Sequence, residues 1–170
     1  NKQNNEIFDF INKSKKKFTR SNYGFWYHNE IKKNKSKYKP KFGDKIFYTF
    51  ECMTLNGEKQ FNFNAKQQIY RMEQQDIISG LREGFKLMSE GDITTFIFPS
   101  YLAYGLYGDS EKKIKPNTTL VYEVNVQKIL KNKAILKESI LNLTKTRTYF
   151  FPNSATSIRS NCSLERGSSL

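Results

Sequence analysis

Cysteine, histidine and acidic residues are scarce in this chain of 170 residues, and each scarcity excludes a class of function. A zinc site needs several cysteines and histidines at regular spacing, and the chain has only Cys52, Cys162 and His28. Two cysteines are also too few for a disulfide framework. Both cysteines are therefore expected to be free thiols, and no metal site is expected. No run of about 18 apolar residues occurs, so the sequence predicts no transmembrane helix.

Basic residues outnumber acidic ones, with 29 Lys and Arg against 16 Asp and Glu, which gives a net charge of +13. Such a charge is typical of proteins that bind nucleic acid or an anionic surface. The lysines are scattered along the chain, however, and no RNP, zinc-finger or helix-turn-helix pattern accompanies them. We interpret the charge as a solvated basic surface and expect no specific nucleic-acid partner. A basic adaptor that binds anionic surfaces through residues 1–41 remains an alternative.

Composition divides the chain into three parts. Residues 1–41 form a basic N-terminal extension with a weak helical pattern and a run of aromatic residues, GFWYH, at 24–28. Residues 42–130 carry the regular hydrophobic patterns of a folded domain. Residues 131–170 end in a Ser/Arg/Asn-rich stretch without periodicity, which predicts a disordered or non-native tail. We expect the two flanks to add little stability, except that GFWYH could cap a sheet edge.

Alternating hydrophobic residues predict several strands within residues 42–130. The predicted strands are Lys45–Cys52, Gln68–Glu73, Asp92–Phe98 and Thr119–Ile129. Asn56-Gly57 predicts a hairpin turn after the first of them, because both residues tolerate positive φ. Apolar residues at helical spacing predict one short amphipathic helix over Ile77–Met88. Many strands with one short helix indicate an α+β fold, an antiparallel sheet wrapped around that helix.

Three consecutive motifs carry a family resemblance. They are QDIISGLREGFKLM at 75–88, GDITTFIFPSYLAYG at 91–105 and PNTTLVYEVNV at 116–126. In this order they resemble the FKBP family of peptidyl-prolyl cis/trans isomerases. The resemblance implies rotation about X-Pro amide bonds of proline-containing polypeptides, in an apolar pocket that needs no cofactor, metal or nucleophile. Macrolide-type molecules are further pocket ligands that it implies.

The resemblance also assigns roles to individual residues. Tyr104 would bond a substrate carbonyl through its hydroxyl, the backbone N–H of Ile78 would hold another carbonyl, and Phe61 would be a pocket aromatic. These three are the predicted catalytic residues. The predicted substrate-binding residues are Phe50, Asn62, Tyr70, Asp76, Ile77, Leu81, Ile114 and Tyr122.

This sequence departs from the family pattern at three of its pocket positions. Phe50 stands where the family has a strand tyrosine, Asn62 stands where it commonly has aspartate, and Gln68 replaces an aromatic residue. Either Phe61 or Phe63 could be the pocket aromatic residue of the family pattern. Residues 60–65 can therefore be aligned with that pattern in two ways. The missing hydroxyl and carboxylate favour weak catalysis, or the alternative of a non-catalytic FKBP-like module that binds peptides within an envelope assembly.

A narrower resemblance rests on four segments. GFWYH at 24–28, PKFGD at 40–44, GLREGFKLM at 80–88 and FPSYLAYGLYGD at 98–109 are similar to the gliding-motility-associated (GldI-type) lipoprotein isomerases of Bacteroidetes. This resemblance implies a folding helper on the periplasmic side of the cell envelope. It also implies a lipid anchor on a cysteine upstream of Asn1.

Overall fold

The structure, a computed structural model, describes residues 2–32, 37–62, 66–111 and 114–133. Contacts define one compact unit over Asn1–Asn132 and a second over Lys133–Leu170, almost all of which lies outside the described residues. The predictions for the tail after residue 133, Cys162 included, therefore lie outside the described residues as well.

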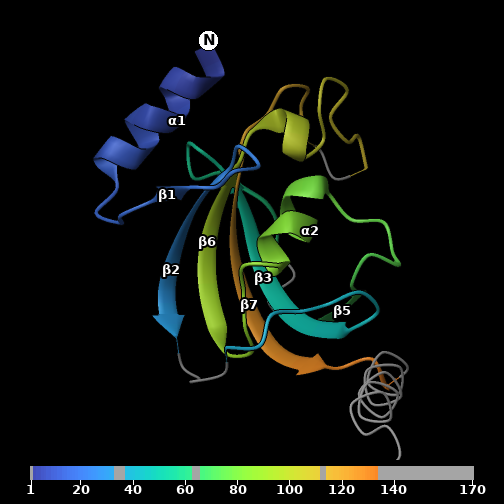
Figure 1. Ribbon diagram of the computed structural model, residues 1–170. Coiled ribbons are helices and arrows are strands. Elements are labelled where there is room, and N and C mark those ends of the chain that lie inside the picture. Colours follow the sequence, from blue (N-terminus) through green and yellow to red (C-terminus); the bar gives the residue numbers. More distant parts are fainter. Residues whose placement is uncertain (1, 33–36, 63–65, 112–113, 134–170) are drawn as a thin grey trace, which may run out of the picture. The chain divides into compact units, whose positions relative to one another are not determined.

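Seven strands of the described chain form one antiparallel sheet (Figure 1). They are β1 (Thr19–Arg20), β2 (Trp26–Lys32), β3 (Lys45–Thr54), β4 (Lys59–Asn62), β5 (Gln68–Arg71), β6 (Asp92–Phe98) and β7 (Leu120–Leu130). Their order in the sheet is β1-β2-β6-β7-β3-β4, and β5 pairs with the first half of β3. The predicted α+β class and FKBP-like antiparallel sheet are confirmed.

The alternation in β3 places its side chains as the sequence predicts. Ile46, Tyr48, Phe50 and Cys52 are buried on one face, whereas Lys45 is exposed. The predicted hairpin follows, since the N–H of Gly57, at φ 81°, donates to the carbonyl of Thr54 and β4 then pairs back onto β3.

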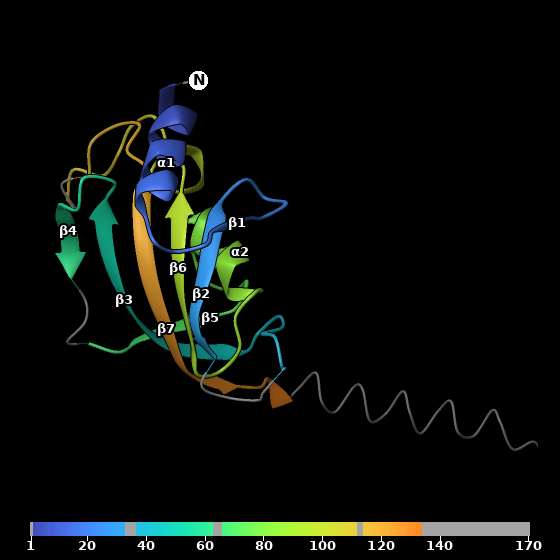
Figure 2. The ribbon, with the colours of Figure 1, turned by 90° about the vertical axis from the view of Figure 1, so that its left-hand side faces the viewer.

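Two helices cover opposite faces of the sheet, as Figures 1 and 2 show together. Helix α2 (Ser79–Phe85) is shorter than the predicted 77–88 and lies on the face where the main core forms. Helix α1 (Lys2–Lys13) lies on the other face. Neither described helix has the length and apolar character needed to span a membrane.

Helix α1 closes a second, smaller core that the sequence analysis did not anticipate. Ile7 is fully buried and packs with Trp26 of β2, Ile97 of β6 and Val121 of β7. Burial on both faces explains why Phe96, Ile97 and Phe98 at the end of β6 are consecutive apolar residues and do not alternate with polar ones. The weak helical pattern of the N-terminal residues thus corresponds to α1, but its packing on the sheet was not predicted.

The aromatic run at 24–28 is part of the sheet. Phe25 is fully buried in the main core, between Phe96 and Phe98, and the strand that begins at Trp26 pairs with β6 along its length. The run was expected to cap a sheet edge, but its strand lies between β1 and β6 and is paired on both sides. Residues 1–41 belong to the same compact unit as the predicted domain, so the boundary at residue 42 does not separate two parts.

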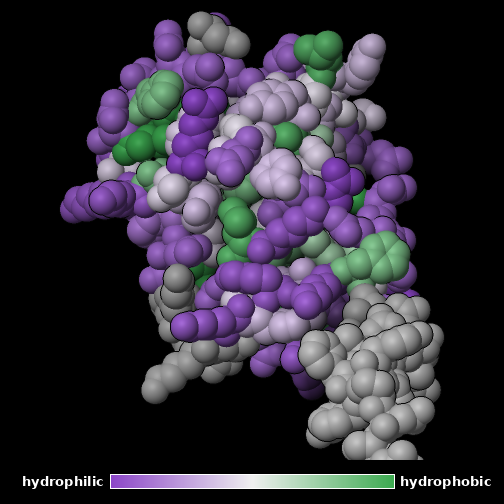
Figure 3. All heavy atoms as spheres, in the orientation of Figure 1, coloured by the Kyte–Doolittle hydropathy of each residue, from purple (hydrophilic) through white to green (hydrophobic). Residues whose placement is uncertain are grey.

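The surface seen in Figure 3 is mainly hydrophilic. Hydrophobic side chains show on this face as small separate areas, one of them over α1.

Candidate functional site

The main core lies between α2 and the sheet, and most of the predicted site residues meet there. Phe50, Tyr70, Leu81, Ile114 and Tyr122 are buried in it, each less than 10% exposed. Three further predicted residues are half-buried and pack against this group, namely Ile77, Ile78 and Tyr104. Eight residues from three strands, the α2 region and the β6–β7 loop thus form one apolar and aromatic cluster.

A stack of aromatic rings forms the sheet side of the cluster. Phe50 stacks on Tyr48 with ring centroids 5.9 Å apart, and on Tyr122 with centroids 5.4 Å apart. Tyr122 also lies 5.5 Å from the ring of Phe98 on β6. The stack follows from register, because β7 lies between β3 and β6 and pairs with both. Phe50 lacks a hydroxyl group, but its stacking partners on both sides carry one.

The Tyr122 hydroxyl is the most deeply buried polar group of the cluster. Burial raises the pKa of Tyr122 far above its usual value, and the neighbouring Cys52 and Tyr104 side chains, to which it is hydrogen-bonded, raise it further. Burial likewise raises the pKa of the Cys52 thiol to about 12. Both groups therefore stay protonated at neutral pH. The half-buried Tyr104 hydroxyl is the member of this network nearest to solvent.

Tyr48 is a site candidate that the sequence analysis missed, because alternation marked it only as an inward-facing core residue. Its side chain is 6% exposed, and its hydroxyl has no hydrogen-bond partner among the described residues. Burial first, and then the nearby Tyr70 and Tyr104, raise its pKa to about 12. A tyrosine in an otherwise apolar strand was the available signal, since a buried hydroxyl needs a partner.

The start of α2 presents backbone donors beside this stack. Ile78 is the N-cap residue, with φ −54° and ψ 138°, and its carbonyl accepts hydrogen bonds from the N–H groups of Leu81 and Arg82. The N–H of Ile78 itself has no acceptor in the part of the chain that the structure describes. An unused donor at a helix start is what binding of a substrate carbonyl requires.

The loop between β6 and β7 supplies the other wall. Its first turn is a 3₁₀ helix at Ser100–Leu102, and the Ser79 hydroxyl donates to the Leu102 carbonyl at 3.3 Å, which joins the loop to α2. Tyr104 follows this turn, and Ile114 is held by paired backbone hydrogen bonds to Asp109.

Large hydrophobic side chains of the same loop remain exposed. Tyr101 is 62% exposed, Leu106 69% and Tyr107 92%. They flank Tyr104 in sequence, so the loop that carries Tyr104 presents exposed apolar side chains. Exposed apolar side chains beside a site are typical of surfaces that contact other polypeptides.

Three predicted residues are not placed in the cluster. Asp76 is exposed and lines a separate polar cavity of about 500 Å³ with Glu73 and Glu83. Phe61 and Asn62 lie in β4, where Phe61 pairs with Cys52 and Asn62 with Glu51. Their side chains, and the whole of Phe63, lie outside the described residues, so the two alternatives for register 60–65 remain.

The Tyr70 hydroxyl has a structural task. It accepts a hydrogen bond from the backbone N–H of Glu73 at 3.1 Å, and its ring stacks on Phe85 of α2.

The cluster therefore offers the hydroxyls of Tyr48, Tyr104 and Tyr122, aromatic faces and aliphatic side chains. Among the described residues, no three His, Cys, Asp or Glu side chains group in a way that could hold a metal ion.

The sequence of this chain matches a known protein family. Residues 36–127, more than half of the chain, match the family described as FKBP-type peptidyl-prolyl cis-trans isomerase. The chain belongs to this family. The matched FKBP segment includes β3 to β6, α2, the loop with Tyr104 and most of β7. It leaves out α1, β1 and β2, so Ile7 and Trp26 of the second core lie outside the matched segment.

Individual relatives agree with this assignment. A probable FKBP-type peptidyl-prolyl cis-trans isomerase, FkpA of Neisseria meningitidis, is 47% identical over 53 residues, which is 31% of this chain and 19% of the relative. The crystal structure of FkpA from Escherichia coli superposes with a TM-score of 0.64 at 25% identity, over 76% of this chain and 58% of that one. The chain thus spans only part of the length of these relatives.

The N-terminal domain of FKBP42 from Arabidopsis thaliana shares the fold, with a TM-score of 0.62 at 19% identity over 70% of this chain and 96% of that domain. A peptidyl-prolyl cis-trans isomerase from Pseudomonas syringae has the same TM-score and identity, and the match covers 76% of this chain. At such identities the likeness establishes the fold alone.

Proposed function

We propose that this protein is a peptidyl-prolyl cis/trans isomerase that acts on proline-containing polypeptides and assists their folding. The observation that carries the proposal is the half-buried Tyr104 hydroxyl, hydrogen-bonded to buried Tyr122 within an otherwise apolar cluster. Membership of the FKBP-type family supports the same reaction.

The physical basis is the loss of resonance when a prolyl amide twists. Resonance imposes a barrier of roughly 18–20 kcal/mol on the rotation. The twisted amide is less dipolar than the planar one, so an apolar surface stabilises it relative to the hydrated ground state. The cluster of Phe50, Leu81 and Tyr122 would supply that surface.

Two hydrogen bonds would hold the substrate while its prolyl bond rotates. The Tyr104 hydroxyl would donate to one carbonyl, and the unused backbone N–H of Ile78 would donate to another. Ile77 and Ile114 would contact the proline ring, and the exposed Tyr101, Leu106 and Tyr107 would contact flanking residues of the polypeptide.

The second candidate is a non-catalytic module that binds peptides through the same surface, and Phe50 in place of a strand tyrosine favours it. Exchange NMR on a short Ala-Pro peptide separates the two functions. An isomerase produces cis/trans exchange cross-peaks at substoichiometric protein concentration. A binding module shifts the peptide resonances but produces no such exchange, and that result would refute the proposal.

The proposed setting is the periplasmic side of the cell envelope, with a lipid anchor upstream of Asn1. The four segments that resemble the gliding-motility-associated lipoprotein isomerases support this setting, as does the likeness to FkpA. Macrolide-type molecules are proposed as ligands of the same apolar cluster. Membrane fractionation of the native protein, with and without a globomycin block of lipoprotein processing, tests the anchor.

A further inference from the structure

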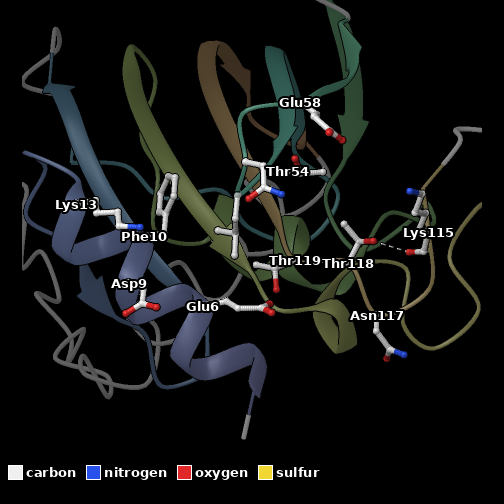
Figure 4. Close-up of a pocket in the computed structure, with 12 residues that line it drawn as sticks. Glu6, Asp9, Phe10, Lys13, Thr54, Glu58, Lys115, Asn117, Thr118 and Thr119 are labelled. Atoms are coloured by element: carbon white, nitrogen blue, oxygen red, sulfur yellow. Dashed lines mark hydrogen bonds between the residues drawn. The ribbon is translucent and has the colours of Figure 1, made fainter.

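A second cavity lies apart from the candidate site. Its volume is about 540 Å³, and its walls are α1, the turn after β3 and the segment that leads into β7. Figure 4 shows the side chains of these three elements that line it. No residue of the proposed isomerase site lines it.

Helix α1 presents a charged stripe to this cavity. Glu6, Asp9 and Lys13 are three and four residues apart in sequence, so they lie on one side of the helix. The buried Ile7 anchors the helix on Trp26 and thereby fixes the direction in which the stripe points. The carboxylates of Glu6 and Asp9 form no hydrogen bond or ion pair with the described residues.

Two buried hydroxyl groups face the same cavity without partners. The Oγ1 atoms of Thr54 and Thr119 are buried and have no hydrogen-bond partner in the described residues. The two threonines are neighbours, because Thr54 pairs with Leu120 at the end of the β3–β7 ladder. Thr119 is only 5% exposed, and in Figure 4 its hydroxyl and the Glu6 carboxylate point toward one another.

These groups define the chemistry of an occupant. A buried hydroxyl without a partner is unfavourable, and because a hydroxyl can both donate and accept, a polar occupant of either kind would satisfy it. The cavity is lined by three carboxylates, on Glu6, Asp9 and Glu58, but only two ammonium groups, on Lys13 and Lys115. The Glu6 and Asp9 carboxylates have no ion-pair partner among the described residues, so this side of the cavity favours a cation over an anion.

We propose that this cavity binds the arginine side chain of a polypeptide. A guanidinium group carries five N–H donors and no acceptor, which suits paired carboxylates and hydroxyl oxygens. The Glu6 and Asp9 carboxylates would accept from its two edges, and Thr54 and Thr119 would accept the remaining donors. The proposal does not depend on the isomerase function, because none of the residues involved belongs to that site.

The test is an NMR titration of the whole ¹⁵N-labelled chain with the blocked tripeptide acetyl-Gly-Arg-Gly-amide. The expected result is saturable shifts of the amide signals of Glu6, Thr54 and Thr119. The matched peptide with citrulline in place of arginine has the same shape without the charge, and it should bind at least about tenfold more weakly. Equal shifts with the citrulline peptide, or none at these residues, would overturn the proposal.

Variants of the chain assign the contacts. Glu6→Gln and Asp9→Asn keep the shape of each side chain, and each should weaken binding of the arginine peptide by roughly three- to tenfold. Glu111→Gln, an exposed carboxylate outside the cavity, should leave binding unchanged. Thr119→Val should weaken binding and leave the melting temperature unchanged or higher, since its hydroxyl has no partner in the fold. Unchanged affinity in Glu6→Gln and Asp9→Asn would contradict the proposed contacts.

Discussion

Gly80 of α2 lies directly against the ring of Phe98 in β6. A Cβ atom at position 80 would be 2.5 Å from Cδ1 of Phe98, closer than side-chain carbons approach one another. Gly84, one turn later, faces Phe96 in the same way, and a Cβ there would be 3.0 Å from the ring. The two glycines let the helix lie close to the sheet, which brings Leu81 and Ile78 to the aromatic stack.

Gly80→Ala should therefore destabilise the fold. Overpacking against Phe98 costs about 1–3 kcal/mol, which exceeds the gain of about 1 kcal/mol in helix propensity. Gly84→Ala, with its longer contact, is the matched control and should cost less. Urea unfolding of both variants measures the difference. A Gly80→Ala chain as stable as wild type would show that α2 does not depend on this contact.

The second core predicts that α1 stabilises the protein. Ile7 is fully buried, so Ile7→Ala should lower the free energy of unfolding by about 2–4 kcal/mol. Asn5→Ala, an exposed position of the same helix, should change it by less than about 0.5 kcal/mol. Thermal and urea unfolding of the two variants provide the comparison. Equal stability of both would mean that α1 is not docked on the sheet.

Stability at alkaline pH should depend on Tyr48. Its pKa is raised to about 12 in the fold from an ordinary value of 10.0, so the folded state holds the phenol proton more tightly than the unfolded state. The associated stability is fully present below pH 10 and is lost as the pH rises through 12. At about 1.4 kcal/mol per pKa unit, the loss amounts to as much as about 3 kcal/mol.

Tyr48→Phe removes this titrating group while keeping the ring. The difference in unfolding free energy between wild type and Tyr48→Phe should hold steady from pH 8 to 9 and then shift toward the variant between pH 10 and 12. Urea unfolding at these pH values measures it. A difference that stays constant up to pH 12 would contradict a buried phenol at this position.

Sequence patterns predicted the main sheet well because its strands are buried on one face. Alternation placed Tyr48 and Phe50 inward, and Asn56-Gly57 marked the hairpin. The second core was missed for the opposite reason, since Ile97 and Phe98 are neighbours buried on different faces and produce no alternation. Nothing local in residues 1–18 indicates that Ile7 has a partner some 90 residues away in β6.

For the candidate site too, the sequence predicted some residues and missed or misplaced others. The motif order predicts that Tyr104, Ile78 and Leu81 lie together, and in the structure Ile78 and Tyr104 pack against the core that contains Leu81. Tyr48 was overlooked, because its unpartnered hydroxyl becomes apparent only when neighbouring side chains are placed around it. Asp76 was included from its place in the motif, but its exposed side chain lies outside the cluster.

Tyr104→Phe should reduce isomerase activity modestly and leave the fold intact. The change removes one hydroxyl, whose hydrogen bond to a substrate carbonyl is worth about 0.5–1.5 kcal/mol. The catalysed rate should then fall roughly two- to tenfold and not vanish. Tyr23→Phe, a 55% exposed tyrosine outside the candidate site, is the control and should retain full activity. Identical rates for the two variants would remove Tyr104 from the proposed mechanism.

The most direct test of the account is a protease-free isomerisation assay that compares wild type with Ile78→Asp. Aspartate is a favoured N-cap residue, so this variant should keep α2 and the fold, as circular dichroism can verify. Its carboxylate brings water to the surface that the twisted amide needs dry. The account predicts measurable catalysis by wild type and at least a tenfold loss in folded Ile78→Asp. An inactive wild type, or a folded Ile78→Asp with full activity, would contradict it.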